Sequence, residues 1–383
     1  MDFALSDEHV ELQAMLRSFF EKEAPTHLVA EWDRNEQFPT ELYRKVAELG
    51  LCGITIAPEY GGSPADEISI CVIAEEMARA AGCLVYAFIP TVTFCAKGIQ
   101  GFGTEDQKRE ILPQVAAGTM RLAMGLSEPD AGSDLTGLAT RAVRDGDDYV
   151  VTGQKIFTTG ADTAQYIFCF VRTNPDAPNS QGMSVLLIPT DAPGVTIHPL
   201  RKLSGQGTHT CEVFLDEVRV PASAMVGEPG QGLSIIFQLL DGERIIVGAQ
   251  GCGIGQGALD MALRHAAERE QFGRPIADFQ AIGHMLADMA LDIEMARLIT
   301  YKAAWKKQNG LPCSMEASMA KIAGSEAGSR CATRGMQILG GYSYMVEYGM
   351  ERLYRETKLN EIAGGSNQIQ RNIVLKNLRR TLR

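Results

Sequence analysis

The chain has 383 residues, of which 45% are hydrophobic and 22% charged, and its formal net charge is −11. This length allows two or three domains with a substantial core, and the composition is that of an ordinary globular protein. An acidic chain without basic runs has no general attraction for nucleic acid or anionic membrane surfaces, so neither is expected as a partner.

Cysteine usage and the N-terminus indicate a compartment. Nine cysteines are spread along the chain without a C-x-x-C pair. Unclustered thiols favour buried side chains in a reducing compartment over a disulfide framework or a metal site, so no metal is expected. The opening MDFALSDEHVEL lacks the regions of a signal peptide, and no uninterrupted apolar run approaches the roughly eighteen residues of a membrane span. We therefore expect a soluble cytoplasmic protein.

Residues 1–118 are predicted to form an N-terminal α-helical domain. Ser6, followed by two acidic residues, is typical of an N-cap and first turn. Apolar residues recur after it at helical spacing. Further amphipathic runs lie at about 39–49, 67–81 and 105–117.

Residues 119–226 change to the period of strands and are predicted to form a middle β domain. Because no helical segment long enough for a parallel crossover separates the strands, an antiparallel barrel or sandwich is expected. The strand-like segments are 149–152, 166–171, 183–188 and 213–215.

Residues 227–383 are predicted to form a C-terminal four-helix bundle, which makes the whole chain a multidomain α+β protein. A G-x-G pattern lies within 251–257, but helical sequence precedes it, which favours close helix packing over a dinucleotide loop. The expected helices are roughly 233–267, 276–308, 315–339 and 367–381.

Two motifs suggest ligand contacts. MGLSEPDAGSD at 124–134 has the composition of a tight turn that exposes backbone N–H groups, although an ordinary polar loop has the same composition. REQFGRPIADFQ at 269–280 joins an arginine to a Gly-Arg-Pro break between two helices. This pattern suits a helix start that receives a pyrophosphate, and equally a surface loop with one solvated arginine.

With QILGG at 337–341 and YRETKLNEIAGGSNQIQR at 354–371, these motifs resemble the acyl-CoA dehydrogenases in the family's order and over essentially the whole chain. Two residues depart from the family's first motif, since Ser127 replaces a threonine and Asp130 a glycine. The resemblance implies an FAD-dependent enzyme.

The resemblance also implies which residues bind FAD. Thr159 would donate its hydroxyl toward flavin N5, although a strand hydroxyl that bonds a neighbour fits the sequence as well. The residues implied for the chain's own FAD are Leu126, Ser127, Ser133, Phe157, Thr158, Thr159, Ser366 and Gln368. Those implied for the FAD of a neighbouring subunit are Arg269, Phe272, Gln280, Gln337, Gly340 and Gly341.

The implied reaction is α,β-dehydrogenation of an acyl-CoA thioester to the trans-2-enoyl-CoA, and it needs a carboxylate to take the α-proton. The family often has a glutamate at the position of Gly364, so the usual base is missing. Glu243, in LLDGERIIVGAQ, lies within an apolar stripe at helical spacing. A carboxylate there is desolvated unless it is paired, for example with Arg244.

A subgroup that resembles isovaleryl-CoA and long-chain acyl-CoA dehydrogenases carries a Glu-Arg pair on this earlier helix and a small residue at the later site. Glu243 is therefore the predicted base, with Glu356 and Glu361 as competing carboxylates. The resemblance further implies that the substrate is contacted by Ser133, Asp241, Arg244, Gly364 and Gly365, with the Gly364 N–H on the thioester carbonyl.

The resemblance implies a homotetramer that passes electrons to an electron-transferring flavoprotein. Three other functions remain open at this point: a flavin-dependent enoyl-CoA reductase similar to crotonobetainyl-CoA reductase, an oxidase, and a catalytically silent acyl-CoA-binding protein. We expect short to medium or branched acyl chains as substrates. The sequence contains no signal for the physiological direction.

Overall fold

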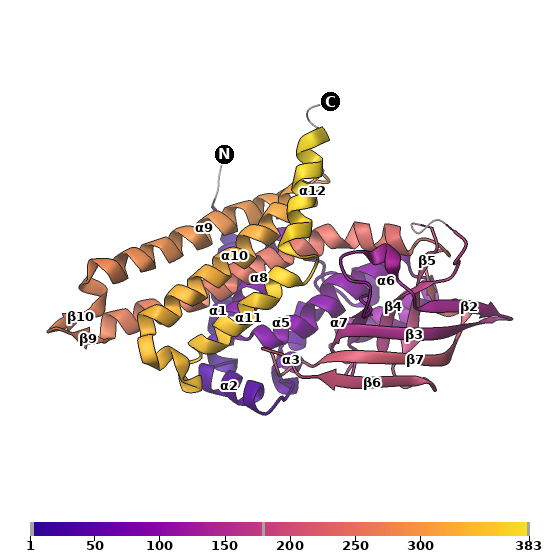
Figure 1. Ribbon diagram of the computed structural model, residues 1–383, viewed down its shortest axis with the longest axis horizontal. Helices are drawn as coiled ribbons and strands as arrows, with labels where there is room; N and C mark the ends of the chain where they lie inside the picture. The colour runs from indigo at the N-terminus through magenta and orange to yellow at the C-terminus, as the bar shows by residue number, and fades with distance from the viewer. Residues whose placement is uncertain (1–3, 178–180, 381–383) are drawn as a thin grey trace.

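The computed structural model describes residues 4–177 and 181–380; the ends of the chain and part of the 174–181 loop lie outside them. Three regions follow one another, helical, sheet and helical, as predicted (Figure 1). The domain limits at 118 and 226 stay predictions. The first region contains α1 (Asp7–Glu23), α2 (Thr26–Arg34), α3 (Thr40–Glu48), α4 (Glu67–Ala80), α5 (Gly82–Phe88), α6 (Ala96–Phe102) and α7 (Glu105–Ala116).

A π-helical segment, Ile89–Cys95, joins α5 to α6 into one continuous helix. Pro90 lies in this segment and has no N–H to donate, which suits a local departure from α-helical bonding. By length and composition the helix Gly82–Phe102 is apolar enough to cross a membrane, a feature that the sequence analysis did not single out. Because 89% of the most apolar 18-residue stretch of this helix is buried inside the protein, the helix forms part of the core.

The second region is one mixed sheet with the strand order β6-β7-β3-β2-β4-β5-β8 and β1 beside β4. Its strands are β1 (Leu122–Gly125), β2 (Arg141–Asp145), β3 (Asp148–Thr159), β4 (Tyr166–Arg172), β5 (Met183–Pro189), β6 (Val195–Leu200), β7 (Thr210–Pro221) and β8 (Met225–Val226). Most neighbours are antiparallel, but both β1 and β2 pair with β4 in parallel, whereas antiparallel pairing was predicted. The β2–β3 hairpin lies between β1 and β4 in the chain and supplies the crossover that a helix usually provides.

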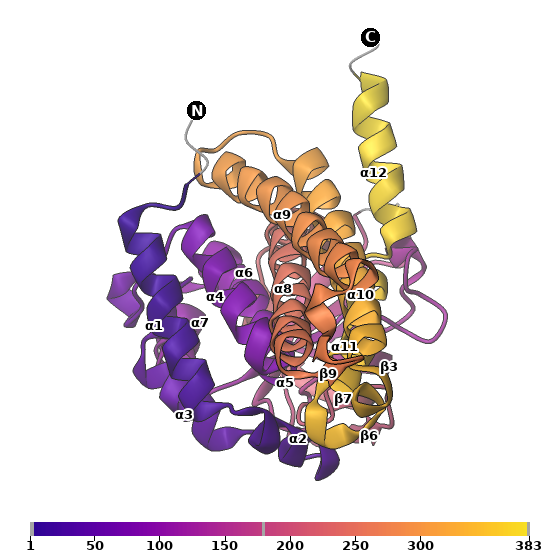
Figure 2. The same cartoon turned by 90° about the vertical axis from the view of Figure 1, so that its left-hand side faces the viewer.

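The third region surrounds a long central helix (Figures 1 and 2). Its elements are α8 (Gly232–Glu268), β9 (Glu270–Gln271), β10 (Arg274–Pro275), α9 (Gln280–Gln308), α10 (Ser314–Leu339), α11 (Met350–Ile362) and α12 (Asn367–Arg380). The polar helix α11 was not predicted. In both views α12 projects away from the body of the molecule.

Glycines allow α8 to pack closely against both neighbouring helices, which confirms the interpretation of 251–257 as a packing motif. A Cβ atom on Gly251 would lie 2.2 Å from the carbonyl oxygen of Gly324 on α10. One on Gly253 would lie 2.1 Å from the carbonyl oxygen of Glu75 on α4. Backbone atoms at these distances leave no room for a side chain, so the position of α8 is fixed from two sides.

Gly253→Ala is expected to lower the melting temperature by roughly 1–4 °C, because overpacking of a core by one methyl costs about 1–3 kcal/mol. Gly101→Ala is the matched control, since no atom lies within 4 Å of its added Cβ. The control should leave the melting temperature unchanged or raise it. Equal melting temperatures for Gly253→Ala and the unaltered protein would contradict the packing argument.

Candidate active site

The loop after β1 makes a tight turn that is anchored to β3. Glu128 and Ala131 exchange both backbone hydrogen bonds, at 2.9 and 3.1 Å, as the composition of this segment predicted. The buried Glu128 carboxylate accepts hydrogen bonds from the backbone N–H of Ala139 at 2.6 Å and of Thr140 at 3.0 Å. The fully buried Lys155 of β3 completes the anchor at 2.7 Å. A buried charge pair with these added hydrogen bonds fixes the loop.

Residues 126–127 and 157–159 therefore lie together. The carbonyl of Ser127 accepts the backbone N–H of Ile156 at 2.9 Å. The Lys155 ammonium donates to the carbonyl of Leu126 at 3.4 Å. Ser133 is exposed on the same loop. Two of the predicted motifs thus form one surface.

Strand β3 is distorted where it meets this loop. Its pairing with β7 shifts register between Lys155 and Thr158. Phe157 has a φ of 59° and is 65% exposed, an unfavourable conformation and environment for an aromatic residue. Thr158 is fully buried, and its hydroxyl has no hydrogen-bond partner within residues 4–177 and 181–380, unlike an ordinary strand hydroxyl. Bulges and backbone strain of this kind cluster at functional sites.

Glu243 lies on α8 opposite the turn between α11 and α12. A Cβ on Gly364 would be 3.8 Å from Oε1 of Glu243. A side chain at position 364 would therefore point at the space that the Glu243 carboxylate already reaches. Gly364 and Gly365 have φ values of 64° and 81°, which glycine adopts without strain.

The Glu243 carboxylate is poorly solvated, although the residue as a whole is partly exposed. Its Oε2 atom is buried and has no hydrogen-bond partner in the part of the chain that the structure describes. Burial raises the pKa of Glu243 to about 7, while the positive charges of Arg244 and Lys321 oppose this rise. A carboxylate that titrates near neutrality is suited to accept a proton.

Arg244 does not pair with Glu243. It is 7% exposed and donates from Nη1 to Oδ1 of Asp241 at 2.8 Å. The Ser314 hydroxyl donates to the same oxygen at 3.0 Å. Asp241 and Arg244 thus form an ion pair beside Glu243 on α8, and Asp241 is partly exposed.

The competing carboxylates are engaged elsewhere. Glu356 is 1% exposed and accepts from Arg352 at 3.1 Å, beneath Gly82, where an added Cβ would lie 2.3 Å from Oε2 of Glu356. Glu361 accepts from Lys358 at 2.6 Å. Both carboxylates are thus paired with a cation of their own helix, which favours Glu243 as the reactive group.

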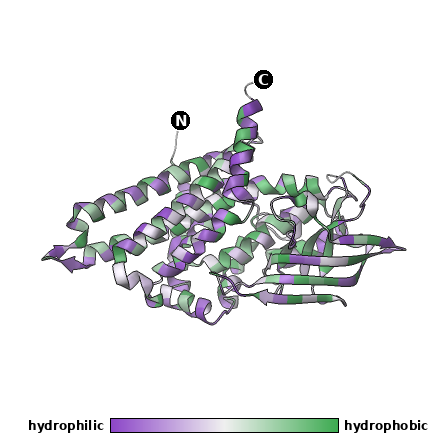
Figure 3. Cartoon of the chain, in the orientation of Figure 1, coloured by the Kyte–Doolittle hydropathy of each residue, from purple (hydrophilic) through white to green (hydrophobic). Residues whose placement is uncertain are grey.

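A second group of predicted residues lies at the far end of α8. Figure 1 shows the β9–β10 hairpin at the end of the molecule opposite the sheet, and Figure 3 shows that it is mostly hydrophilic. Phe272 at its tip is 93% exposed. The Arg269 guanidinium lies 5.7 Å from the ring centre of Tyr342, beside the turn of Gly340 and Gly341. The exposed residues Gln280, at the start of α9, and Gln337, near the end of α10, belong to the same end.

One chain therefore does not bring the two groups together. Glu243 and Arg269 are separated by 26 residues of sequence along α8, which corresponds to roughly 39 Å. This separation exceeds the reach of one dinucleotide. The two groups therefore cannot contact one dinucleotide within the same chain, and the family resemblance assigns the second group to the FAD of a neighbouring subunit.

Sequence reasoning missed the side chains that support the glycine turn. Gln370 is fully buried and donates to the carbonyls of Gly364 at 3.0 Å and Gly365 at 2.9 Å. Ser366 accepts the N–H of Ile369 at 3.4 Å, whereas Gln368 is exposed. The spacing of two glutamines in NQIQR, with one on each side of the helix, was the available signal.

Comparison with known proteins identifies the family. Models of the acyl-CoA dehydrogenase N-terminal, middle and C-terminal domains match residues 6–119, 123–218 and 230–379. Probable acyl-CoA dehydrogenase YngJ of Bacillus subtilis (strain 168) is 41% identical over 99% of this chain and 100% of its own length. Acryloyl-CoA reductase (NADH) of Anaerotignum propionicum is 36% identical over 98% of this chain and 95% of its own.

Two solved structures extend the likeness to the whole fold. Butyryl-CoA dehydrogenase from Megasphaera elsdenii superposes with a TM-score of 0.94 at 36% identity and covers 99% of this chain and 100% of its own. A chain from the structure of the electron transferring flavoprotein of Acidaminococcus fermentans gives 0.95 at 38% identity, with 99% of both chains covered. The chain therefore belongs to the acyl-CoA dehydrogenase family of FAD-dependent oxidoreductases, which confirms the predicted family, fold class and cofactor.

Proposed function

We propose that the protein dehydrogenates an acyl-CoA thioester between Cα and Cβ with Glu243 as the base. The observation that carries this assignment is the 3.8 Å between Oε1 of Glu243 and a Cβ built on Gly364. Glu243 takes the α-proton, and the β-hydrogen leaves as hydride. Bound FAD supplies the hydride acceptor. The Gly364 N–H bonds the thioester carbonyl and stabilises the charge that develops on its oxygen.

The surface formed by the loop after β1 and by β3 fits the flavin. The exposed ring of Phe157 offers an apolar surface to a flat heterocycle, and Thr159 retains a hydroxyl for N5. Leu126 and Ser127 border the same surface through their contacts with β3. These residues bind and orient the cofactor, whereas Glu243 moves the proton.

We further propose short to medium or branched acyl chains as substrates and an electron-transferring flavoprotein as electron acceptor. Butyryl-CoA dehydrogenase and the A. fermentans structure among the similar folds support these two proposals. A cytoplasmic location is proposed as well, in keeping with nine cysteines that are all free and buried. Bleaching of the bound flavin across a panel of acyl-CoA chain lengths measures the substrate preference.

The similarity to an acryloyl-CoA reductase favours enoyl-CoA reduction as the second candidate function. The same Glu243 would then return a proton to Cα. Anaerobic titration separates the directions, because a dehydrogenase is bleached by a saturated acyl-CoA. Reoxidation of the reduced protein by an enoyl-CoA, without bleaching by the saturated ester, would establish the reductase instead.

Glu243→Gln is expected to retain FAD and to lose flavin bleaching by substrate by at least about 10²-fold, because the base is removed while its shape is kept. Stopped-flow absorbance under anaerobic conditions measures the rate. Glu361→Gln is the matched control and should bleach at the normal rate, since the Glu361 carboxylate bonds only Lys358 among the described residues. Substantial turnover by Glu243→Gln would refute the assignment.

The pKa of Glu243 predicts a pH dependence of activity and of stability. Because the ionised form is the base, kcat/KM should fall to half its maximum near pH 7 and decrease further in acid. The folded-state pKa is raised, so ionisation weakens the folded state as pH rises from about 4.5 to 7. Glu243→Gln should therefore be more stable by at most about 3 kcal/mol, or roughly 4 °C, above pH 7, with no advantage below pH 4.5. Melting curves from pH 4 to 9 measure this difference.

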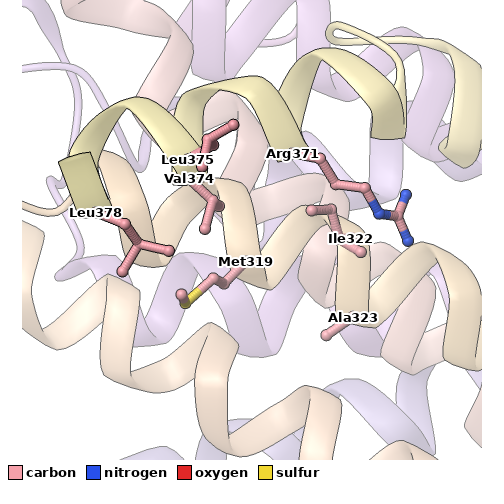
Figure 4. Close-up of a pocket in the computed structure, with 7 residues that line it drawn as sticks. All are labelled: Met319, Ile322, Ala323, Arg371, Val374, Leu375 and Leu378. Atoms are coloured by element: carbon pink, nitrogen blue, oxygen red, sulfur yellow. The ribbon is translucent and has the colours of Figure 1, made fainter.

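We also propose that the protein is a homo-oligomer, a tetramer by family resemblance, in which the partner's hairpin end completes each FAD site. One face of α9 exposes Leu291 at 57%, Met295 at 52% and Leu298 at 43%, a helical stripe without a covering element. An apolar hollow of about 380 Å³ lies between α10 and the projecting α12, and Figure 4 shows the residues that line it. Met319, Ile322, Val374, Leu375 and Leu378 contribute to its wall. A second copy of the chain is the occupant that fits both surfaces.

Co-expression of two inactive variants tests the shared site. Glu243→Gln chains retain Arg269, and Arg269→Ala chains retain Glu243. If each FAD site combines Glu243 of one chain with Arg269 of another, randomly mixed dimeric units regain about a quarter of the active sites. Activity of the purified mixture, relative to each variant expressed alone, is the measurement. A mixture that forms oligomers but shows no activity above the single variants would exclude a shared site.

A further inference from the structure

A buried lysine forms hydrogen bonds to both ends of the turn that contains Gly364. Lys321 of α10 has no solvent exposure. Its ammonium donates to the carbonyl of Glu361 at 3.0 Å, in the last turn of α11, and to Oδ1 of Asn367 at 2.9 Å, the first residue of α12. One side chain therefore joins both ends of the turn that contains Gly364.

Asn367 and Gln370 extend this contact. Asn367 is 3% exposed, and its amide donates to the Ser325 hydroxyl at 3.1 Å. Gln370 holds the two glycine carbonyls of the turn from the side of α12. The turn is thus fixed by buried polar side chains on two sides, and its backbone N–H groups keep one orientation.

The burial of Lys321 is costly. Both of its hydrogen-bond partners among residues 4–177 and 181–380 are neutral oxygens. Burial lowers the pKa of Lys321 to about 8, the negative charges of Glu361 and Glu243 oppose this, and Arg244 adds to it. Replacement by an apolar side chain would remove this cost, so the lysine serves a purpose other than core stability.

We propose that Lys321 is a positioning residue, which holds the Gly364 turn against Glu243 and, by its charge, favours the ionised form of that carboxylate. This inference rests on the proposed role of Glu243. The groups that face Glu243 are Arg244 of its own helix, Lys321 of α10 and the Cys95 thiol of the π-helical segment. Glu326 of α10 also lies near Lys321.

Lys321→Met tests the proposal in the FAD-loaded protein. We expect kcat to fall at least about 10-fold with a smaller change in KM, because the turn acts mainly on the transition state. The pH of half-maximal kcat/KM should rise by about one unit, because a nearby positive charge is lost. The control Lys45→Met removes a partly buried lysine that pairs with Glu23 in the N-terminal region and should change neither quantity.

A lysine with a structural role alone would give a different result. Lys321→Met would then lower the melting temperature and leave kcat and the pH profile of the holoenzyme unchanged, and this outcome overturns the proposal. If Lys321→Met does not fold, Asn367→Asp decides the question. This variant keeps the hydrogen bond to Lys321, but its carboxylate offsets the ammonium charge. The pH of half-maximal kcat/KM should therefore rise by at least about half a unit. An unchanged profile overturns the proposal.

A measurement without turnover separates this inference from the role of Glu243. The stability gained by Glu243→Gln should level off near pH 7 in the normal background and about one unit higher in the Lys321→Met background. Equal values in the two backgrounds contradict the electrostatic coupling. If Glu243→Gln proves active, the assigned base is wrong, while the stability shift still reports the coupling.

Discussion

The site depends on one desolvated carboxylate beside a turn that has no side chain. Glu243 is held on α8, and α8 is held by glycines that bring the backbones of α4 and α10 into contact with it. The ionised form of Glu243 is therefore unstable in the folded protein for the same reason that it is a useful base. Close packing fixes its position, and poor solvation sets its proton affinity near neutral pH.

The residues proposed to contact the cofactor lie in two groups that are far apart in one chain. The loop after β1 and the distorted β3 form one surface, and the glycine turn lies beside Glu243. Arg269, Phe272 and the Gly340 turn form another group about 40 Å along α8. The Phe272 ring is 93% exposed and lies 6.0 Å from the Phe279 ring of the same chain. Under the proposed shared site, assembly and cofactor binding would be linked.

The sequence predicted those features that leave a local pattern. Strand and helix periods separated the three regions, and glycines at helical spacing indicated close packing around α8. Glu243 was found because an apolar stripe surrounds it and because the family resemblance directed attention to a missing base. The orientation of Glu243 toward Gly364 is visible only in the structure, since no spacing rule relates α8 to a turn more than a hundred residues later.

Other features leave no such pattern. The polar helix α11 lacks a clear apolar face, and the parallel pairing of β1 with β4 depends on a hairpin that serves as the crossover. Lys321 lies in SMAKIAGSEAG, where a lysine at one end of a run of small residues is indistinguishable from a solvated one. Its burial depends on the packing of α11 and α12 over α10, which is a tertiary property.

The burial of the cysteines has a chemical consequence. All nine thiols are buried, and burial raises the pKa of Cys52 and Cys169 to about 11 and of Cys83 to about 12. Thiolate is the form that alkylating reagents and peroxide attack, and its fraction at neutral pH is minute at these sites. A flavoprotein whose reduced cofactor reacts with oxygen would release hydrogen peroxide within its own structure. In this chain the cysteine thiols would meet such peroxide in their protonated form, which reacts slowly.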